Sequence, residues 1–373
     1  MVKVIAFYLP QYHEIPENNK WWGEGFTEWT NVKKSKPTFK GQIQPESPLK
    51  GNYYDLSNPE VMVEQAALAK KYGINGFCYY HYWFNGKLLL QKPLENMLKN
   101  KNVNIPFCIS WANETWSRNW NGQNTKILIK QNYNETKEMW KKHFDYLLPF
   151  FKDNRYIYYN EKPLMIIYKP YLIHNCEDML QYWDKLARDY GLEGLSFAYQ
   201  HHTSFLHPNP KFDFGIEFEP FYTIGELKKK GLLPPDDKKE KVFFYEKHPR
   251  QLLKKIKEKL DSKPTIYDYD AIWKDIISRK NLDNHMPGAF PAWDNTPRRG
   301  VNAQVFFEAT PQKFEKYIDL QLEKSIKEGK EYLFVNAWNE WAEGAHLEPD
   351  EYNKFGYLEA VKKAINKTGV KHE

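Results

Sequence analysis

Eight short apolar or aromatic runs, most of them separated by amphipathic stretches, restrict this chain to very few folds. Such alternation is typical of parallel strands joined by crossover helices. The runs occupy residues 2–10, 74–83, 105–113, 162–170, 194–201, 212–220, 286–294 and 331–341. Eight strands close a (β/α)8 barrel, whereas a doubly wound sheet usually has fewer strands and a glycine-rich phosphate turn. The chain contains neither GxGxxG nor GxxxxGK. We therefore predict an α/β fold, with residues 1–373 forming a single (β/α)8 (TIM) barrel domain.

Two long connections interrupt this predicted barrel. The first is a long loop after strand 1, which ends where Asn58 and Pro59 provide a capping residue and a proline at the first helical position. The second connection, residues 221–285, lies between strands 6 and 7 and includes an amphipathic stretch at 248–260. We interpret 221–285 as a solvated helical insertion at the rim of the barrel.

Composition excludes several classes of protein. The formal net charge is +6, from 54 basic and 48 acidic residues, and glutamates interrupt the lysine runs, so nucleic-acid binding is not indicated. No apolar stretch reaches the roughly 18 residues of a membrane span, and the first residues lack a signal-peptide cleavage site. The cysteines Cys78, Cys108 and Cys176 have no zinc-site spacing. We expect a cytoplasmic protein with reduced thiols, no transmembrane segment, no metal and no cofactor; the sequence identifies no protein partner.

The segment after the last predicted strand carries the clearest indication of chemistry. Residues 336–344 read Asn-Ala-Trp-Asn-Glu-Trp-Ala-Glu-Gly, which places Glu340 and Glu343 three positions apart. On a helical turn their Cβ atoms would lie about 5–6 Å apart, so the two carboxyl groups could not both ionise freely. One could then serve as an acid and the other as a base, as glycosidic cleavage requires.

An ordinary exposed helix also carries Glu-x-x-Glu very often, so the pair alone does not indicate a site. Its position at the end of a buried strand, between Trp338 and Trp341, favours the functional interpretation. These two indoles would keep the pair dry and offer apolar faces to a sugar ring.

A second concentration of aromatic residues lies in the loop after strand 1, at residues 21–32. Trp22, Phe26 and Trp29 could stack on sugar rings, and Glu28 could hydrogen-bond to sugar hydroxyls. A self-packed loop with buried aromatics explains the same residues, and the two interpretations can coexist.

Two shorter patterns have both a functional and a structural interpretation. Arg298 and Arg299 follow strand 7, where they could bind a carboxylate or phosphate, orient an acid, or form a salt bridge at the rim. Asp268 and Asp270 form an Asp-x-Asp of the kind that holds a divalent metal and a nucleotide sugar in many transferases. That pattern is short and lies inside the predicted insertion, so we give it little weight.

Five long strings give the chain a family resemblance: FYLPQYHEIPENNKWWGEGFTEWTNV, GFCYYHYWF, ISWANETW, PAWDNTPRRG and WNEWAEGAHLEPD. Nearly end to end, it resembles the WbsX-like proteins of polysaccharide biosynthesis loci, which carry a domain similar to glycoside hydrolase family 99. The resemblance implies a single (β/α)8 barrel. Members are often labelled lipopolysaccharide biosynthesis proteins or glycosyltransferases, and the related hydrolases are retaining endo-α-mannosidases that need no metal.

The resemblance also implies roles for the two glutamates. It assigns Glu340 as the base that deprotonates the substrate 2-hydroxyl, which attacks the anomeric carbon to give a 1,2-anhydro sugar. It assigns Glu343 as the acid that protonates the leaving oxygen and then activates water. An α-mannoside or α-rhamnoside has the required geometry. The candidate substrate-binding residues are Tyr8, Trp22, Trp29, His81, Trp111, Asn113, Glu114, Tyr199, Glu217, Trp293, Asp294, Arg298, Trp338, Asn339 and Trp341.

Three functions remain open from the sequence. The leading hypothesis is a glycoside hydrolase or transglycosylase that acts on an α-linked oligosaccharide or polysaccharide. The second is a nucleotide-sugar-dependent glycosyltransferase of lipopolysaccharide, O-antigen or capsule biosynthesis, although no nucleotide cradle is evident. The third is a non-catalytic carbohydrate-binding barrel.

Overall fold

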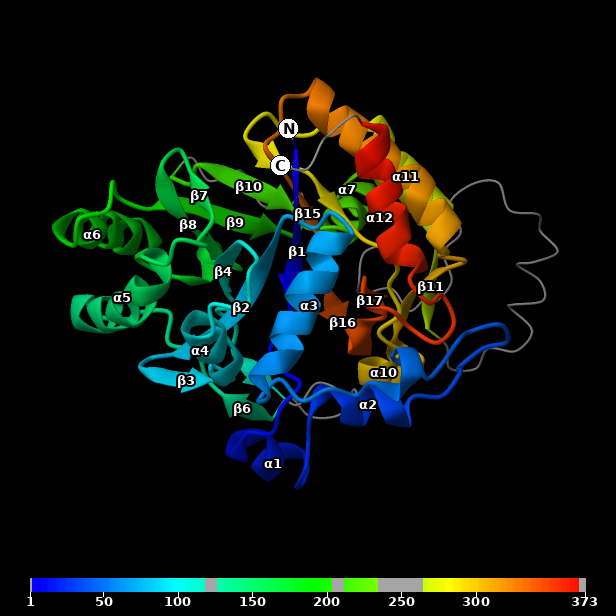
Figure 1. Ribbon diagram of the computed structural model, residues 1–373, viewed down its shortest axis with the longest axis horizontal. Helices are drawn as coiled ribbons and strands as arrows, with labels where there is room; N and C mark the ends of the chain where they lie inside the picture. Colours follow the sequence, from blue (N-terminus) through cyan, green and yellow to red (C-terminus); the bar gives the residue numbers. More distant parts are fainter. Residues whose placement is uncertain (1, 118–125, 203–210, 234–263, 369–373) are drawn as a thin grey trace.

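The computed structural model describes residues 2–117, 126–202, 211–233 and 264–368. Nine parallel strand segments form a nearly closed barrel, seen in Figure 1 with β1 near its middle. The segments are β1 (Lys3–Tyr8), β2 (Gly76–Phe84), β4 (Phe107–Trp111), β8 (Lys162–Ile167), β9 (Ser196–His201), β10 (Phe214–Glu217), β12 (His285–Met286), β13 (Gly288–Ala289) and β15 (Tyr332–Val335). All eight predicted runs contribute to this barrel, so the predicted fold class is confirmed.

The seventh strand is split in two. β12 pairs with β10 and β13 pairs with β15, both in parallel, and only Pro287 separates β12 from β13. A proline has no N–H to donate to a ladder, which explains the interruption. Its carbonyl still accepts a hydrogen bond of 3.0 Å from the Phe334 amide. The barrel therefore closes through 285–289, and 290–294 leave it as a loop.

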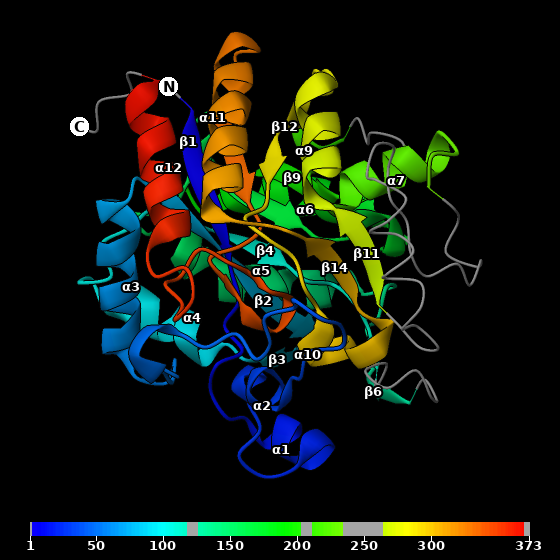
Figure 2. The ribbon, with the colours of Figure 1, turned by 90° about the vertical axis from the view of Figure 1, so that its right-hand side faces the viewer.

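Helices cover the outside of the barrel (Figures 1 and 2). They are α3 (Pro59–Lys71), α4 (Lys92–Lys99), α5 (Lys137–Phe151), α6 (Cys176–Asp189), α7 (Phe221–Lys229), α9 (Tyr269–Ser278), α11 (Pro311–Lys327) and α12 (Gly356–Lys367). The predicted start of α3 is confirmed, because the Asn58 side chain accepts a hydrogen bond from the Glu60 amide and Pro59 is the first helical residue. Thr136, Asp268 and Thr310 cap α5, α9 and α11 in the same way.

Short elements connect the strands and helices. They are α1 (Pro16–Trp22), α2 (Glu28–Lys34), η1 (Leu49–Gly51), β3 (Lys87–Leu89), β5 (Trp116–Ser117), β6 (Ile127–Ile129), β7 (Tyr158–Tyr159), η2 (Pro170–Leu172), β11 (Thr265–Asp268), α10 (Thr296–Arg299), η3 (Gly300–Asn302), β14 (Gln304–Phe307), β16 (Asn339–Glu340), η4 (Trp341–Glu343) and β17 (Ala345–His346). The long loop after strand 1 thus includes α1 and α2. In Figure 1 these two helices lie with α10 and β16 at the carboxyl end of β1.

The described part of the predicted insertion, 221–285, contains α7, β11 and α9. β11 is a strand that the sequence did not predict, and it pairs in parallel with β14 outside the barrel sheet. The amphipathic stretch 248–260 lies outside the described residues.

The Asp-x-Asp pattern has structural partners. Asp268 caps α9 by accepting from the Ala271 amide, while Asp270 pairs with Lys313 and accepts from the Tyr317 hydroxyl. In the described ranges, no group of His, Cys, Asp and Glu side chains has an arrangement that could hold a metal ion. In those same ranges, no helix is long and apolar enough to cross a membrane.

Strand alternation decides which side chains reach the barrel interior. Phe7 packs against Tyr80, Phe218 and Phe334, with ring centroids 5.4–5.7 Å apart, and so lies inside the barrel. The next residue, Tyr8, points to the outer face, where its hydroxyl donates to Gln65 of α3. Because successive strand residues face opposite sides, an inward Phe7 requires an outward Tyr8.

Candidate active site

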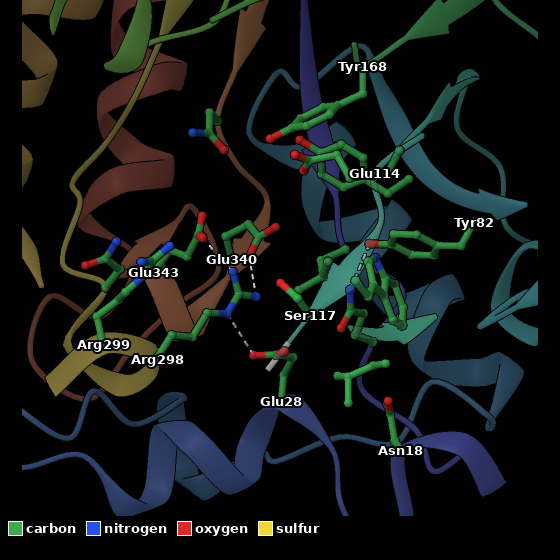
Figure 3. A pocket seen from close by; sticks show the side chains of 18 of the residues that line it. Asn18, Glu28, Tyr82, Glu114, Ser117, Tyr168, Arg298, Arg299, Glu340 and Glu343 are labelled. Atoms are coloured by element: carbon green, nitrogen blue, oxygen red, sulfur yellow. Dashed lines mark hydrogen bonds and ion pairs between the residues drawn. The ribbon is translucent and has the colours of Figure 1, made fainter. Parts of the chain in front are cut away.

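A cavity of about 460 Å³ opens at the carboxyl ends of the barrel strands. This volume is within the usual range for small-molecule sites, and the carboxyl end is where barrel enzymes place their chemistry. Four carboxylates, two arginines and many aromatic rings line it (Figure 3). These lining residues are Glu28, Glu114, Glu340, Glu343, Arg298, Arg299, Trp22, Phe26, Tyr80, Tyr82, Trp116, Tyr168, Phe218, Phe221 and Trp293.

Hydrogen bonds hold the segment after strand 8, which carries the two glutamates, in place. The Asn339 side chain bonds to both backbone groups of Leu9, accepting from the amide at 2.7 Å and donating to the carbonyl at 3.0 Å. The Tyr12 hydroxyl donates to the Asn339 carbonyl and accepts from the Trp341 amide. The segment carrying Glu340 and Glu343 is therefore attached to the end of strand 1, which sets the direction of both side chains.

Gly344 ends this segment in a left-handed conformation, with φ of 58°. A Cβ at this position would lie 2.8 Å from the backbone nitrogen of Asp294, and that nitrogen donates to the Glu343 carbonyl at 2.7 Å. Glycine thus permits both the positive φ and the close approach of the loop after strand 7.

One guanidinium joins three carboxylates at the cavity wall. Arg298 donates from Nη1 to Glu343 at 2.6 Å, from Nη2 to Glu340 at 3.1 Å, and from Nε to Glu28 at 3.2 Å. Figure 3 shows Arg298 between these three side chains. Arg298 comes from α10, Glu28 from α2, and the other two from β16 and η4, so the cluster unites the loops after strands 1, 7 and 8.

Burial raises the pKa of both glutamates of the pair. For Glu340, burial and the neighbouring Glu343 and Glu28 charges raise the pKa to about 8, against the lowering effect of Arg298. For Glu343, burial is again the largest cause of a raised pKa, with Arg298 opposing it. The Glu340 side chain is 8% exposed and that of Glu343 is 22% exposed, so burial opposes a charge on Glu340 more strongly. Because both carboxyl groups contact the same guanidinium, protonation of one affects the other, and protons bind to them as a pair.

This raised pKa has a measurable consequence for stability. An unfolded glutamate has a pKa of about 4.3, below the folded value of about 8 for Glu340. The folded protein therefore binds more protons, and the free energy of unfolding falls as pH rises through that window. Glu340→Gln cannot titrate, so in chemical denaturation it should gain stability relative to wild type as pH rises from 4.3 to 8. Parallel pH curves for the two proteins would contradict the assignment; Glu24→Gln, at an exposed position, is the matched control.

Aromatic rings form the remaining walls of the cavity. Trp22 stacks near Phe26 with centroids 5.8 Å apart, and Phe221 meets Trp293 edge-on at 4.7 Å. Such faces suit the CH surface of a sugar ring, while carboxylates and hydroxyls suit its polar edge.

Nine of the residues named in the sequence analysis line this cavity. They are Trp22, Phe26, Glu28, Glu114, Trp293, Arg298, Arg299, Glu340 and Glu343. Glu114 pairs with Lys169, and Figure 3 shows Glu114 beside Tyr168 on a different wall from Arg298.

Five predicted strand residues point away from the cavity. Alternation turns them outward, toward the helices or the neighbouring outer-face side chains. Tyr8 bonds to Gln65, His81 to His143 at 2.8 Å, Tyr199 to His285, Glu217 to Arg279, and Trp111 packs edge-on against His143. They are structural residues of the layer between sheet and helices.

The other six predicted residues lie in the connections between strands, where they bond to or pack against neighbouring side chains and backbone groups. Trp29 donates to the Tyr54 carbonyl, Asn113 bonds to both backbone groups of Lys169, Asp294 accepts from Gln42 and Gln44, Trp338 packs against Phe77, Asn339 bonds to Leu9, and Trp341 donates to Glu348. None of the six lines the cavity.

The sequence analysis missed Tyr80, Phe218 and Phe221 as lining residues. Tyr80 precedes His81 on β2 and Phe218 follows Glu217, so each of these two errors is one residue along the chain, whereas Phe221 begins α7. The inward position of Phe7 would have identified Tyr80, but only after the barrel register was known.

The fold and the cavity define the class: the described residues form an α/β barrel with a pocket at the carboxyl ends of its strands. Among solved structures, it resembles the GH99 endo-alpha-mannosidase from Bacteroides thetaiotaomicron, with a TM-score of 0.53, 15% identity and 98% of each chain covered. It also resembles a protein described as "Glycoside hydrolase-like protein", with a TM-score of 0.57, 11% identity, and 97% of this chain and 93% of the other covered. At such identities the likeness concerns the fold.

The sequence comparisons identify the family. The model of the family described as "Glycosyltransferase WbsX" matches residues 4–361, and the chain belongs to that family. A relative from two strains of Xanthomonas campestris pv. campestris, "Uncharacterized protein WxcX", is 33% identical over 371 residues. These residues are 98% of this chain and 50% of the relative, so the chain spans about half the length of the relatives it matches.

Proposed function

We propose that this protein is a glycoside hydrolase or transglycosylase that cleaves an α-linked, mannoside- or rhamnoside-like sugar with retention of configuration. The observation that carries the proposal is the carboxyl pair Glu340 and Glu343, bridged by Arg298 in an aromatic-lined cavity. Retaining cleavage needs one carboxylate and one carboxylic acid at the reacting bond, and this pair supplies both.

The proposed reaction has two steps. In the first, Glu340 takes the proton of the 2-hydroxyl, and that oxygen attacks the anomeric carbon to form a 1,2-anhydro sugar. The glycosidic C–O bond breaks, and Glu343 gives its proton to the leaving oxygen. In the second, Glu343 takes a proton from water or from an acceptor hydroxyl, whose oxygen opens the anhydro ring, and Glu340 returns its proton to the 2-oxygen. Two inversions at the anomeric carbon give retention.

The Glu340 side chain is the less exposed of the two, at 8% against 22%, so burial opposes the charge that the first step needs on Glu340. The first step therefore requires the proton to lie on Glu343 when the substrate is bound. Both carboxyl groups contact the same guanidinium, and moving the proton from one to the other leaves the total charge of the cluster unchanged.

A second candidate is a nucleotide-sugar-dependent glycosyltransferase, which the family description favours. The cavity charge argues against it. Among the described lining residues, four carboxylates stand against two arginines, and carboxylates already occupy Arg298 on three sides. The diphosphate of a nucleotide sugar would meet net negative charge there.

We further propose that the enzyme acts in the cytoplasm on a polysaccharide of the cell surface.

Thermal unfolding with the two ligand classes separates these candidates. A ligand at 100 times its dissociation constant adds about 2.7 kcal/mol to the free energy of unfolding. We expect α-linked manno- or rhamno-oligosaccharides to raise the unfolding temperature, and nucleotide sugars to leave it unchanged with or without Mn²⁺. Stabilisation by a nucleotide sugar alone would reverse the preference and favour the glycosyltransferase.

A further inference from the structure

Glu28 is a buried carboxylate that the proposed reaction leaves unused. It is the first residue of α2, and its side chain is 1% exposed. Helix α2 is short and fixed by a reciprocal capping box between Thr27 and Thr30, so the position of Glu28 is set by local backbone structure. One of its oxygens lies 3.2 Å from Nε of Arg298.

The charges of this cluster do not balance when every carboxyl group is ionised. Arg298 contributes one positive charge, and Glu28, Glu340 and Glu343 would contribute three negative charges. In a poorly hydrated site, like charges around one cation repel strongly. Binding a proton to one carboxylate lowers this repulsion at the smallest cost in free energy. Among the described residues, Glu28 alone forms an ion pair with Nε of Arg298.

The other groups that face the cluster do not replace its charge. Arg299 of α10 is exposed, and its positive charge lowers the pKa of Glu343 only against the larger effect of burial. Glu114 lies on a different wall of the cavity, and the remaining neighbours among the described residues are neutral phenols, from strand 2 and from the segments that follow strands 1 and 4. These phenols are Tyr12, Tyr80, Tyr82 and Tyr168.

We propose that Glu28, acting through Arg298, is a positioning residue that keeps one proton on the Glu340 and Glu343 pair at neutral pH. Without Glu28, Arg298 would pair with two carboxylates instead of three, and both could remain ionised down to a lower pH. With Glu28 in place, its negative charge offsets the positive charge of Arg298. One carboxyl group of the pair then stays protonated and can act as the acid that bond cleavage needs. The inference rests on the proposed function only in calling this pair catalytic.

Infrared titration of protonated carboxyl groups tests the inference without a substrate. The carbonyl band that disappears in Glu340→Gln or Glu343→Gln identifies the pair. In Glu28→Gln, which keeps the size and an acceptor for Nε, this band should titrate about one pH unit lower than in wild type. Glu28→Asp keeps the charge and should restore most of the wild-type midpoint. Glu24→Gln removes one exposed charge from the same loop and should leave the midpoint unchanged.

An unchanged midpoint in folded Glu28→Gln would overturn the inference, because a merely structural role alters stability and not titration. Should that variant fail to fold, Arg298→Lys provides the second test: loss of the three-way contact should raise the midpoint, and an unchanged midpoint would again overturn the inference. The pH profile of kcat/KM distinguishes the two proposals. If the infrared midpoint moves in Glu28→Gln and the alkaline limb of activity does not, Glu28 tunes the pair and the pair is not the catalytic one.

Discussion

Glu343→Gln should lower kcat/KM on substrates with poor leaving groups by about 10²- to 10⁴-fold, the usual contribution of a general acid. The glutamine keeps the shape of the side chain and an acceptor for Arg298, but it has no proton to give to the leaving oxygen. With an activated aryl leaving group the first step needs little protonation, so its rate should fall much less.

Steady-state kinetics on both substrate types would measure this difference, and circular dichroism would show that the variant is folded. Glu24→Gln serves as the charge-matched control. Equal activity of wild type and Glu343→Gln on the poor leaving group would remove Glu343 from the catalytic role. A carbohydrate-binding barrel without activity would bind oligosaccharide in wild type, Glu340→Gln and Glu343→Gln alike.

Arg298→Ala should destabilise the protein by about 3–5 kcal/mol at neutral pH, because it leaves buried carboxylates without their cation. Glu28 and Glu340 have side-chain exposures of only 1% and 8%, so water cannot take the place of the guanidinium without rearrangement. Chemical denaturation monitored by tryptophan fluorescence would measure the loss. The matched control is Arg299→Ala, because Arg299 is exposed on the same helix and should cost less than about 0.5 kcal/mol.

The deficit of Arg298→Ala should depend on pH in a defined direction. Removing the arginine raises the folded-state pKa of its carboxylate partners further above the unfolded value of about 4.3. The folded variant then binds more protons than the unfolded chain, so its stability falls as pH rises above 4.3. We expect a small difference from wild type below that pH and a growing difference above it. A deficit independent of pH would show that the arginine acts through packing alone.

The strands of the barrel could be predicted because each is a compact apolar run, and all eight runs were confirmed. The split of strand 7 at Pro287 could not be predicted, because it depends on which neighbours pair with each half. Strand β11 was missed for a similar reason: its four residues lie outside the barrel sheet and are defined by pairing with β14.

The candidate site was predicted unevenly. Glu340, Glu343 and Arg298 were identified because charged residues next to apolar strand ends are unusual whatever the neighbours are. His81, Trp111 and similar strand residues were assigned to the wrong face. Their strands are buried along their whole length and mostly apolar or aromatic on both faces, so the sequence gives no signal for inside or outside. A shift of one residue along β2, from His81 to Tyr80, reverses the face.

The sequence by itself determined the barrel class, the carboxyl ends where polar groups gather, and the spacing that makes Glu340 and Glu343 neighbours. Those properties depend on residues close together along the chain. Only the tertiary structure decided which face of each strand looks inward, and that Glu28 meets Arg298, 270 positions away. The physical reason is that barrel closure fixes the strand register and brings three distant loops to one guanidinium, and no local pattern in the chain encodes that meeting.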